Sequence, residues 1–153
     1  MRRKESMGYQ VNHLGRLLAQ ALRDRIAHHG VVPGQFAQLL ALYEEDGLTQ
    51  SRLRERVSID QSTMAHTLQR MERDGLVRRV ADHDDRRRAI ILLTEHARGL
   101  EHELVGAAES VNKVATRGFT REEVNLYRQL TDRMIHNLET AAEATAPEET
   151  GSR

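Results

Sequence analysis

The chain has 153 residues and a mass of 17.5 kDa, a size that suits one domain with or without additional dimerising helices. Its 23 Lys and Arg residues balance its 23 Asp and Glu residues, yet residues 50–90 carry ten basic and seven acidic side chains. A basic centre is expected where only that part of the chain meets a polyanion. The lack of cysteine excludes disulfide scaffolds and thiol chemistry. The sequence has no run of 18 apolar residues that would predict a membrane span.

The N-terminal segment lacks the apolar stretch of a secretory signal, so we expect a cytoplasmic protein that makes no contact with a membrane. Residues 1–7 are predicted to form a disordered tail. From about residue 8 to residue 29, apolar residues recur every three or four positions, which predicts a long amphipathic helix. Its apolar stripe consists of Val11, Leu14, Leu17, Leu18, Ala21, Leu22 and Ile26.

Three shorter helices are predicted next, over residues 34–45, about 49–56 and about 61–74. Pro33 suits the first turn of the first of them, because the nitrogen there needs no hydrogen-bond partner. Thr49 and Asp60 are candidate N-caps of the second and third helices, and Gly75 is a candidate C-terminal stop. The side expected to be buried consists of Leu53, Val57, Ile59, Met64, Leu68 and Met71.

Two short β-prone runs at residues 76–80 and 89–93 flank a polar segment and predict a β-hairpin. The loop lacks an Asn-Gly or Gly-X pair, so it should be longer than a two-residue turn. Its residues 82–85 hold three carboxylates and one imidazole, but a charged loop tip is more often a solvated loop than a cation site.

A zinc site on the helix that follows is not expected either. His96 and His102 lie six residues apart, so they do not lie on the same face of that helix. We therefore expect no metal and no other cofactor.

A fifth helix is predicted to begin after Thr94, as one long element that ends at Gly118. Its apolar stripe runs from Ala97 to Val114 at helical spacing. Residues 120–123 read Thr-Arg-Glu-Glu, a capping box that predicts the start of a sixth helix reaching about Ala144. The remaining residues, 146–153, are predicted to be disordered.

Short helices followed by a β-hairpin predict a winged helix-turn-helix, so the fold class is mainly α with a small β-hairpin wing. A capped helix with a polar outer face can lie in the major groove of DNA, and an Arg-rich hairpin tip can reach the adjacent minor groove. The polar positions on the fourth helix that suit base edges are Gln61, Ser62, Thr63, His66, Thr67 and Arg70. Candidate phosphate contacts are Thr49, Arg52, Arg54 and Arg73.

The stretch over residues 47–98, GLTQSRLRERVSIDQSTMAHTLQRMERDGLVRRVADHDDRRRAIILLTEHAR, resembles the winged-helix core of the MarR family of bacterial transcription regulators. The wing carries the family's Asp-x-Arg signature at residues 85–87, followed by the Leu-Thr pair at 93–94. The order of helices fits over residues 8–144. In one respect the chain departs from many relatives, which have proline after the first Asp of the wing, where this chain has His83.

The resemblance implies a homodimer that binds double-stranded DNA. It divides the chain into an N-terminal dimerisation helix (8–32), a winged helix-turn-helix domain (33–94) and C-terminal dimerisation helices (95–145), between the tails 1–7 and 146–153. It also implies that the fourth helix faces the major groove and that Arg86 or Arg87 enters the minor groove, with Asp85 orienting an Arg. Arg88 is either a further wing contact or a partner of Asp82 or Asp84.

The resemblance further implies a small-molecule effector, often an aromatic carboxylate, bound between the dimerisation helices and the DNA-binding lobe. The matching positions are His13 and Arg16, one turn apart on the first helix, with Phe36 and Tyr43 as an apolar wall. His13 and Arg16 can equally be ordinary surface or dimer-contact residues.

Two functions from different classes follow. The first is a ligand-responsive regulator, most simply a repressor, that binds a pseudo-palindromic operator. The alternative is a winged-helix dimer that acts through protein–protein contact, such as an antirepressor or a scaffold, although the outer face of the fourth helix lacks large apolar anchors. An enzyme is not expected, because the sequence has no Gly-rich phosphate loop, HExxH or GxSxG motif.

Overall fold

The computed structural model describes residues 2–145, which divide into one compact unit that extends to Ala115 and a second that begins at Thr116. The elements of the first unit are η1 (Arg3–Glu5), α1 (Met7–Ile26), η2 (Ala27–His29), α2 (Pro33–Glu44), β1 (Leu48–Thr49), α3 (Gln50–Val57), α4 (Gln61–Arg73), β2 (Val77–Ala81), β3 (Ala89–Leu93), α5 (Glu95–Gly99) and α6 (Glu101–Ala115), where η marks a 3-10 helix. The second unit holds α7 (Arg121–Thr145). None of the helices in the described part of the chain is long and apolar enough to cross a membrane.

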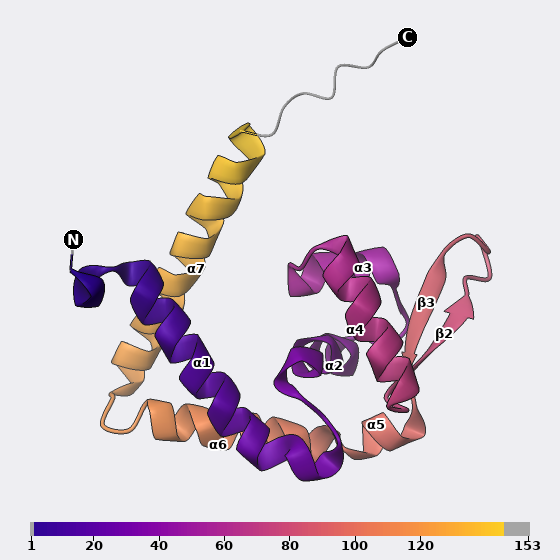
Figure 1. Ribbon diagram of the computed structural model, residues 1–153, viewed down its shortest axis with the longest axis horizontal. Coiled ribbons are helices and arrows are strands. Elements are labelled where there is room, and N and C mark those ends of the chain that lie inside the picture. Colours follow the sequence, from indigo (N-terminus) through magenta and orange to yellow (C-terminus); the bar gives the residue numbers. More distant parts are fainter. Residues whose placement is uncertain (1, 146–153) are drawn as a thin grey trace. The chain divides into compact units, whose positions relative to one another are not determined.

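Apolar faces of nearly every element of the first unit meet in one core cluster. Leu39 of α2, Leu53 of α3 and Leu68 of α4 are fully buried there, as is Ile91 of β3. In Figure 1, α2 lies between α4 on one side and α1 and α6 on the other, and α4 runs beside the hairpin. This arrangement is the predicted winged helix-turn-helix, so the predicted fold class is confirmed.

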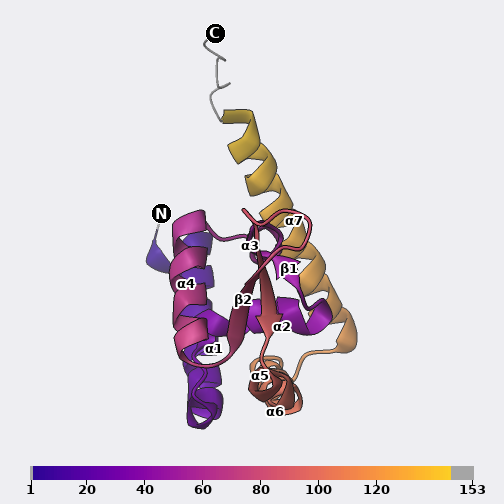
Figure 2. The ribbon, with the colours of Figure 1, turned by 90° about the vertical axis from the view of Figure 1, so that its right-hand side faces the viewer.

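The wing differs from the predicted two-stranded hairpin, because three strands form the sheet within residues 2–145. The order is β1-β3-β2, and both pairs are antiparallel. The added strand pairs Leu48 with Ile91 and Thr49 with Ile90. Figure 2 shows β2 and β3 projecting beside α4. The two-residue strand β1 is too short to show the alternation that predicts a strand from sequence.

The predicted helix caps are confirmed. The side chains of Thr49, Asp60 and Thr94 each accept a hydrogen bond from a backbone N–H three residues on, at the starts of α3, α4 and α5. Gly75 has φ +71°, the left-handed conformation that ends a helix without steric cost. The capping box of α7 is also formed, since the Thr120 N–H donates to Glu123 and the Glu123 N–H donates to Thr120.

Two predicted elements were wrong. Within the described part of the tail expected to be disordered, Arg3–Glu5 form η1, and Ser6 caps α1, which begins at Met7. The long helix expected from Thr94 to Gly118 is broken into α5 and α6. At the break the Leu100 N–H donates to the carbonyls of Ala97 and Arg98, a tighter turn than an α-helix makes. The preceding Gly99 favours this, because glycine is a poor helix former. The predicted tail at 146–153 lies outside the described residues.

The core extends past both predicted ends of the DNA-binding domain, at residues 33 and 94. Ile26 and Val31 from the N-terminal segment, and Ala97 and Leu104 from α5 and α6, belong to the same cluster as the helix-turn-helix. By contrast, α1 and α7 each carry large apolar side chains at their surfaces. Those on α1 are Met7, Val11, Leu14 and Leu17; those on α7 are Leu126, Tyr127, Leu130, Met134, Ile135 and Leu138.

Asp46, just after α2, ties the base of the wing to its neighbours. Its Oδ1 accepts hydrogen bonds from the Leu93 and Gly47 N–H groups, both at 2.9 Å, and its Oδ2 pairs with the Arg98 guanidinium at 2.5 Å. Partial burial alone would raise the pKa of Asp46, but the hydrogen bonds from Arg98, Leu93 and Gly47 outweigh it and lower the pKa. The ionised carboxylate therefore stabilises the junction of α2, β3 and α5.

We expect Asp46→Asn to lower the free energy of unfolding by about 1–3 kcal/mol, because charge-assisted hydrogen bonds are lost. A group whose pKa is lowered on folding stabilises above its unfolded pKa of about 3.9 and loses that effect as the pH falls. The difference between the wild type and the variant, measured by denaturant unfolding, should therefore shrink below about pH 4. Asp132→Asn, on the exposed surface of α7, is the control. An equal loss in both variants would contradict the role of Asp46.

Candidate nucleic-acid interface

Helix α4 presents a polar face to solvent because its large apolar residues are all buried on the opposite face. Met64, Leu68 and Met71, spaced by four and three residues, are each fully buried. This fixes the rotation of the helix about its axis. Five of the six predicted base-reading side chains are consequently exposed and Thr67 is partly buried; the exposed ones are Gln61, Ser62, Thr63, His66 and Arg70.

The first turn of α4 is organised by the Asp60 carboxylate. It accepts from the Thr63 N–H at 2.8 Å, from the Thr63 hydroxyl at 2.6 Å and from the Ser62 hydroxyl at 2.9 Å. These hydrogen bonds, those from Thr63 first, lower the pKa of Asp60 to about 2. The two hydroxyls therefore donate to the cap, and the exposed side chains of α4 that remain as outward donors are Gln61, His66, Gln69, Arg70 and Arg73.

The other end of α4 is held by a buried amide. Gln35 on α2, which is 2% exposed, donates from Nε2 to Asp74 Oδ2 at 2.8 Å and accepts from the Val32 N–H at 3.2 Å. The hydrogen bond from Gln35, with a further one from Arg73, lowers the pKa of Asp74. Arg73, expected as a phosphate contact, thus lies 3.3 Å from an acidic partner.

In the wing, two acidic residues give the adjacent Arg residues different roles. Asp85 accepts from the backbone N–H of Arg87 at 3.0 Å, and its Oδ1 lies 3.4 Å from Arg87 Nε. Asp82 is 8% exposed and lies 3.4 Å from Arg88 Nε, so Arg88 braces the loop. The Arg87 side chain is 93% exposed, and Arg86 is exposed too. Asp85 therefore contacts Arg87, whose side chain is almost fully exposed, and also lies 3.8 Å from Arg88 Nε.

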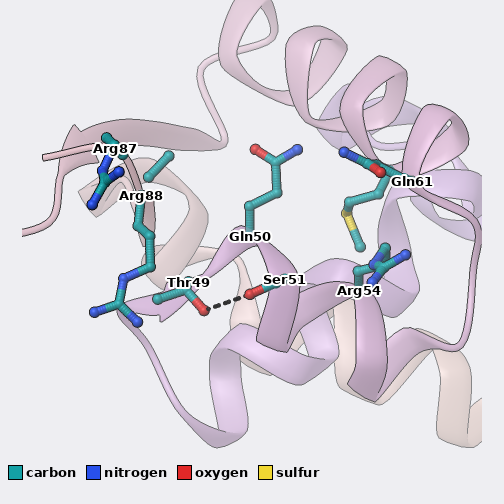
Figure 3. Close-up of a pocket in the computed structure, with 9 residues that line it drawn as sticks. Thr49, Gln50, Ser51, Arg54, Gln61, Arg87 and Arg88 are labelled. Carbon is teal, nitrogen blue, oxygen red and sulfur yellow. Dashed lines mark hydrogen bonds between the residues drawn. The ribbon is translucent and has the colours of Figure 1, made fainter. Parts of the chain in front are cut away.

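A groove of about 310 Å³ lies between the wing and the starts of α3 and α4. Figure 3 shows Arg87 and Arg88 on one side of it and Gln61 and Arg54 on the other. The remaining residues that line it are Thr49, Gln50, Ser51, Met64 and Ala89. A second hollow on α4 is lined by His66, Gln69, Arg70 and Arg73. Both sites gather guanidinium and amide donors, which suit phosphate oxygens and base edges.

Of the predicted phosphate contacts, Thr49 and Arg54 line the groove, and Arg52 is exposed on α3. The Thr49 hydroxyl accepts from the Arg52 N–H at 3.3 Å and lies 3.3 Å from the Ser51 hydroxyl. Gln50 and Ser51 also line the groove and were not predicted from the sequence. The sequence feature that could have predicted them is the polar first turn that follows the capping residue Thr49. The first turn of a capped helix exposes backbone N–H groups and short polar side chains that can bind phosphate.

The four predicted effector residues are distributed differently. His13 stacks on Tyr9, with 6.1 Å between ring centroids, and lines a shallow surface hollow to which neither Arg16, Phe36 nor Tyr43 contributes. Phe36 is buried in the core. The Tyr43 hydroxyl donates to the Ala97 carbonyl at 2.7 Å, and burial, followed by the charge of Glu101, raises the pKa of Tyr43 to about 12.

The fold and the basic groove define a winged helix-turn-helix protein, and the model of the MarR family matches residues 32–89. The transcriptional regulator HosA of Escherichia coli is 31% identical over 102 residues, 67% of this chain and 76% of that protein. The regulator TtmR of Methylorubrum extorquens is 39% identical over 82 residues, 54% of this chain and 42% of that protein. Among solved structures, the PcaV transcriptional regulator from Streptomyces coelicolor in complex with its natural ligand has a TM-score of 0.81 and 26% identity, and covers 89% of this chain and 96% of that one.

The chain therefore belongs to the MarR family of transcriptional regulators.

We expect Asp60→Ala to fray the first turn of α4, so that the Thr63 amide exchanges its hydrogen much faster than in the wild type. Since the pKa of Asp60 is about 2, the wild-type cap should persist as the pH falls through 4 and be lost only near pH 2. Amide hydrogen exchange followed by NMR measures both effects. Thr120→Ala, which removes the matching cap of α7, should leave the Thr63 amide unchanged; acceleration there would show that the effect is not local.

Proposed function

We propose that this MarR-family protein is a transcriptional repressor that binds a pseudo-palindromic operator as a homodimer and is released by a small aromatic carboxylate. One observation carries the proposal. Arg87, which Asp85 contacts, borders the same groove as Gln61 at the start of α4. A wing and a polar helix that share one groove suit simultaneous contact with the minor and major grooves of DNA.

In this proposal the base-reading face of α4 consists of Gln61, Ser62, Thr63, His66, Thr67 and Arg70. The hydroxyls of Ser62 and Thr63 donate to Asp60, so these two residues can only accept hydrogen bonds from DNA or contribute to shape complementarity. The hydrogen-bond donors of this face are Gln61, His66 and Arg70. Arg86 and Arg87 contact the minor groove, and Asp85 and Arg88 hold the loop. Phosphate contacts come from Thr49, Arg52, Arg54 and Arg73.

The homodimer is supported by the apolar side chains that α1 and α7 expose, since large apolar surface of this kind marks a protein interface. Two copies would present two α4 helices about 34 Å apart, one turn of DNA. The match to a regulator solved with its natural ligand supports an effector, and the aromatic acid follows from the family resemblance. His13 and Arg16, both exposed on α1, are its proposed carboxylate partners.

We expect the purified protein to select one duplex from a random library and to bind it far more tightly than scrambled DNA at about 150 mM salt. Arg70→Ala and Arg87→Ala should each weaken binding about 10-fold or more, because one good base contact is worth about 1–3 kcal/mol. Fluorescence anisotropy measures both. Arg117→Ala, outside the winged helix, is the charge-matched control. Equal, weak binding to selected and scrambled DNA would contradict the proposal and favour a protein partner.

A panel of aromatic acids titrated into the protein–DNA complex should contain at least one that lowers the affinity for DNA, because a ligand that prefers the unbound form shifts the equilibrium toward it. Arg16→Ala should weaken binding of that acid about 10-fold through loss of one charge-assisted hydrogen bond. Isothermal titration calorimetry on the DNA-free protein measures this, with Arg25→Ala on the same helix as the control. Unchanged affinity in Arg16→Ala would remove Arg16 from the effector site.

A further inference from the structure

Arg79 occupies a position in β2 where the strand pattern calls for an apolar residue. Successive side chains of a strand alternate between faces, so Arg79 lies on the same face as Val77, which is 3% exposed. Its cross-strand partner in the sheet register is Ile91, which is fully buried. The Arg79 side chain is only 29% exposed, whereas the adjacent Arg78 is exposed.

The guanidinium of Arg79 connects the wing to both helices of the helix-turn-helix. Its Nε lies 3.3 Å from Glu72 Oε1 on α4, and its Nη1 donates to Gln50 Oε1, the first residue of α3, at 3.3 Å. Gln50 lines the groove that Arg87 borders. Figure 3 shows Gln50 between the wing residues and Gln61. One side chain therefore joins β2, α3 and α4, and its partner Gln50 lines the candidate DNA-binding groove.

The partly buried guanidinium of Arg79 contributes little to the stability of the fold. Arg79 Nε is buried, and among residues 2–145 it finds no acceptor in hydrogen-bonding geometry, although Glu72 lies within ion-pair distance. A partly desolvated guanidinium with an incomplete set of partners contributes less to stability than an apolar residue of similar size. Its planar guanidinium instead fixes the distances and angles between the groups that it contacts, Gln50 and Glu72.

We infer that Arg79 is a positioning residue that holds the wing at a set distance from α4, so that Arg87 reaches the minor groove while α4 occupies the major groove. The inference rests on the proposed DNA-binding function. It assigns Arg79 no contact with DNA. Its effect passes through Gln50 and Glu72 to the relative placement of two DNA-contacting elements.

Arg79→Met tests this, because methionine fills the site without the guanidinium. The melting temperature of the variant should be at least that of the wild type, while the affinity for the duplex selected by the wild-type protein falls about tenfold. Arg78→Met removes the same charge one residue away on the other face and should change affinity less than about threefold. Glu72→Gln tests the same connection from α4 and should weaken binding in the same direction as Arg79→Met.

A double-mutant cycle with Arg87→Ala separates positioning from other effects. If Arg79 acts by placing Arg87, adding Arg79→Met to Arg87→Ala should cost little further affinity. Losses that multiply would overturn the inference, as would a large drop in melting temperature for Arg79→Met, or an equal loss of affinity in Arg78→Met. Wild-type affinity in Arg79→Met alone overturns only the positioning role. Equal, weak binding of the wild-type protein to selected and scrambled DNA overturns the proposed function itself.

Discussion

The burial of one face of α4 is the constraint on which the rest of the interface depends. Met64, Leu68 and Met71 leave the helix no freedom to rotate, because turning it would expose them to water at about 1.5–3 kcal/mol for each side chain. The opposite face must then be polar. The same contacts that fold the domain thus leave Gln61 exposed beside the groove, while Met64 lines the groove from the core. Recognition is in this sense a consequence of packing.

Carboxylates hold the joints at which the DNA-binding elements meet. Asp60 closes the start of α4, Asp74 its end, Asp46 the root of the wing and Asp82 its tip. Asp60, Asp46 and Asp82 accept from backbone N–H groups, whereas Asp74, at the C-terminal end of α4, accepts from the side chains of Gln35 and Arg73. Three of the four, Asp46, Asp60 and Asp74, have lowered pKa values, which means that each is more stably ionised in the fold than in water. Three of the four also pair with an Arg side chain: Asp46 with Arg98, Asp74 with Arg73 and Asp82 with Arg88.

Local signals in the sequence were sufficient for most of the fold. Caps, a C-terminal glycine and a change of apolar spacing from helical to alternating placed α3, α4, β2 and β3 correctly, because each signal acts within a few residues. The failures were non-local. Strand β1 exists only through its pairing with β3, and the α5–α6 break depends on a tight turn that the continuous apolar stripe conceals. For the site, exposure of the α4 face followed from periodicity, but the hydrogen bonds of Gln35 and Arg79 span 39 and 29 residues and leave no local pattern.

The continuous core of the first unit links the end of α1 to α4, and it is therefore relevant to how effector binding on α1 would affect DNA binding. Ile26 and Val31, at and after the end of α1, belong to the same buried cluster as Leu68 on the inner face of α4. Packed interiors resist deformation, so a displacement of the end of α1 cannot be absorbed there without moving its neighbours. Gln35 adds a polar connection, since it joins the Val32 N–H at the start of α2 to Asp74 at the end of α4. These contacts connect α1, which carries the proposed effector residues, to α4, and a ligand shifts such a connection only if it binds the two states unequally.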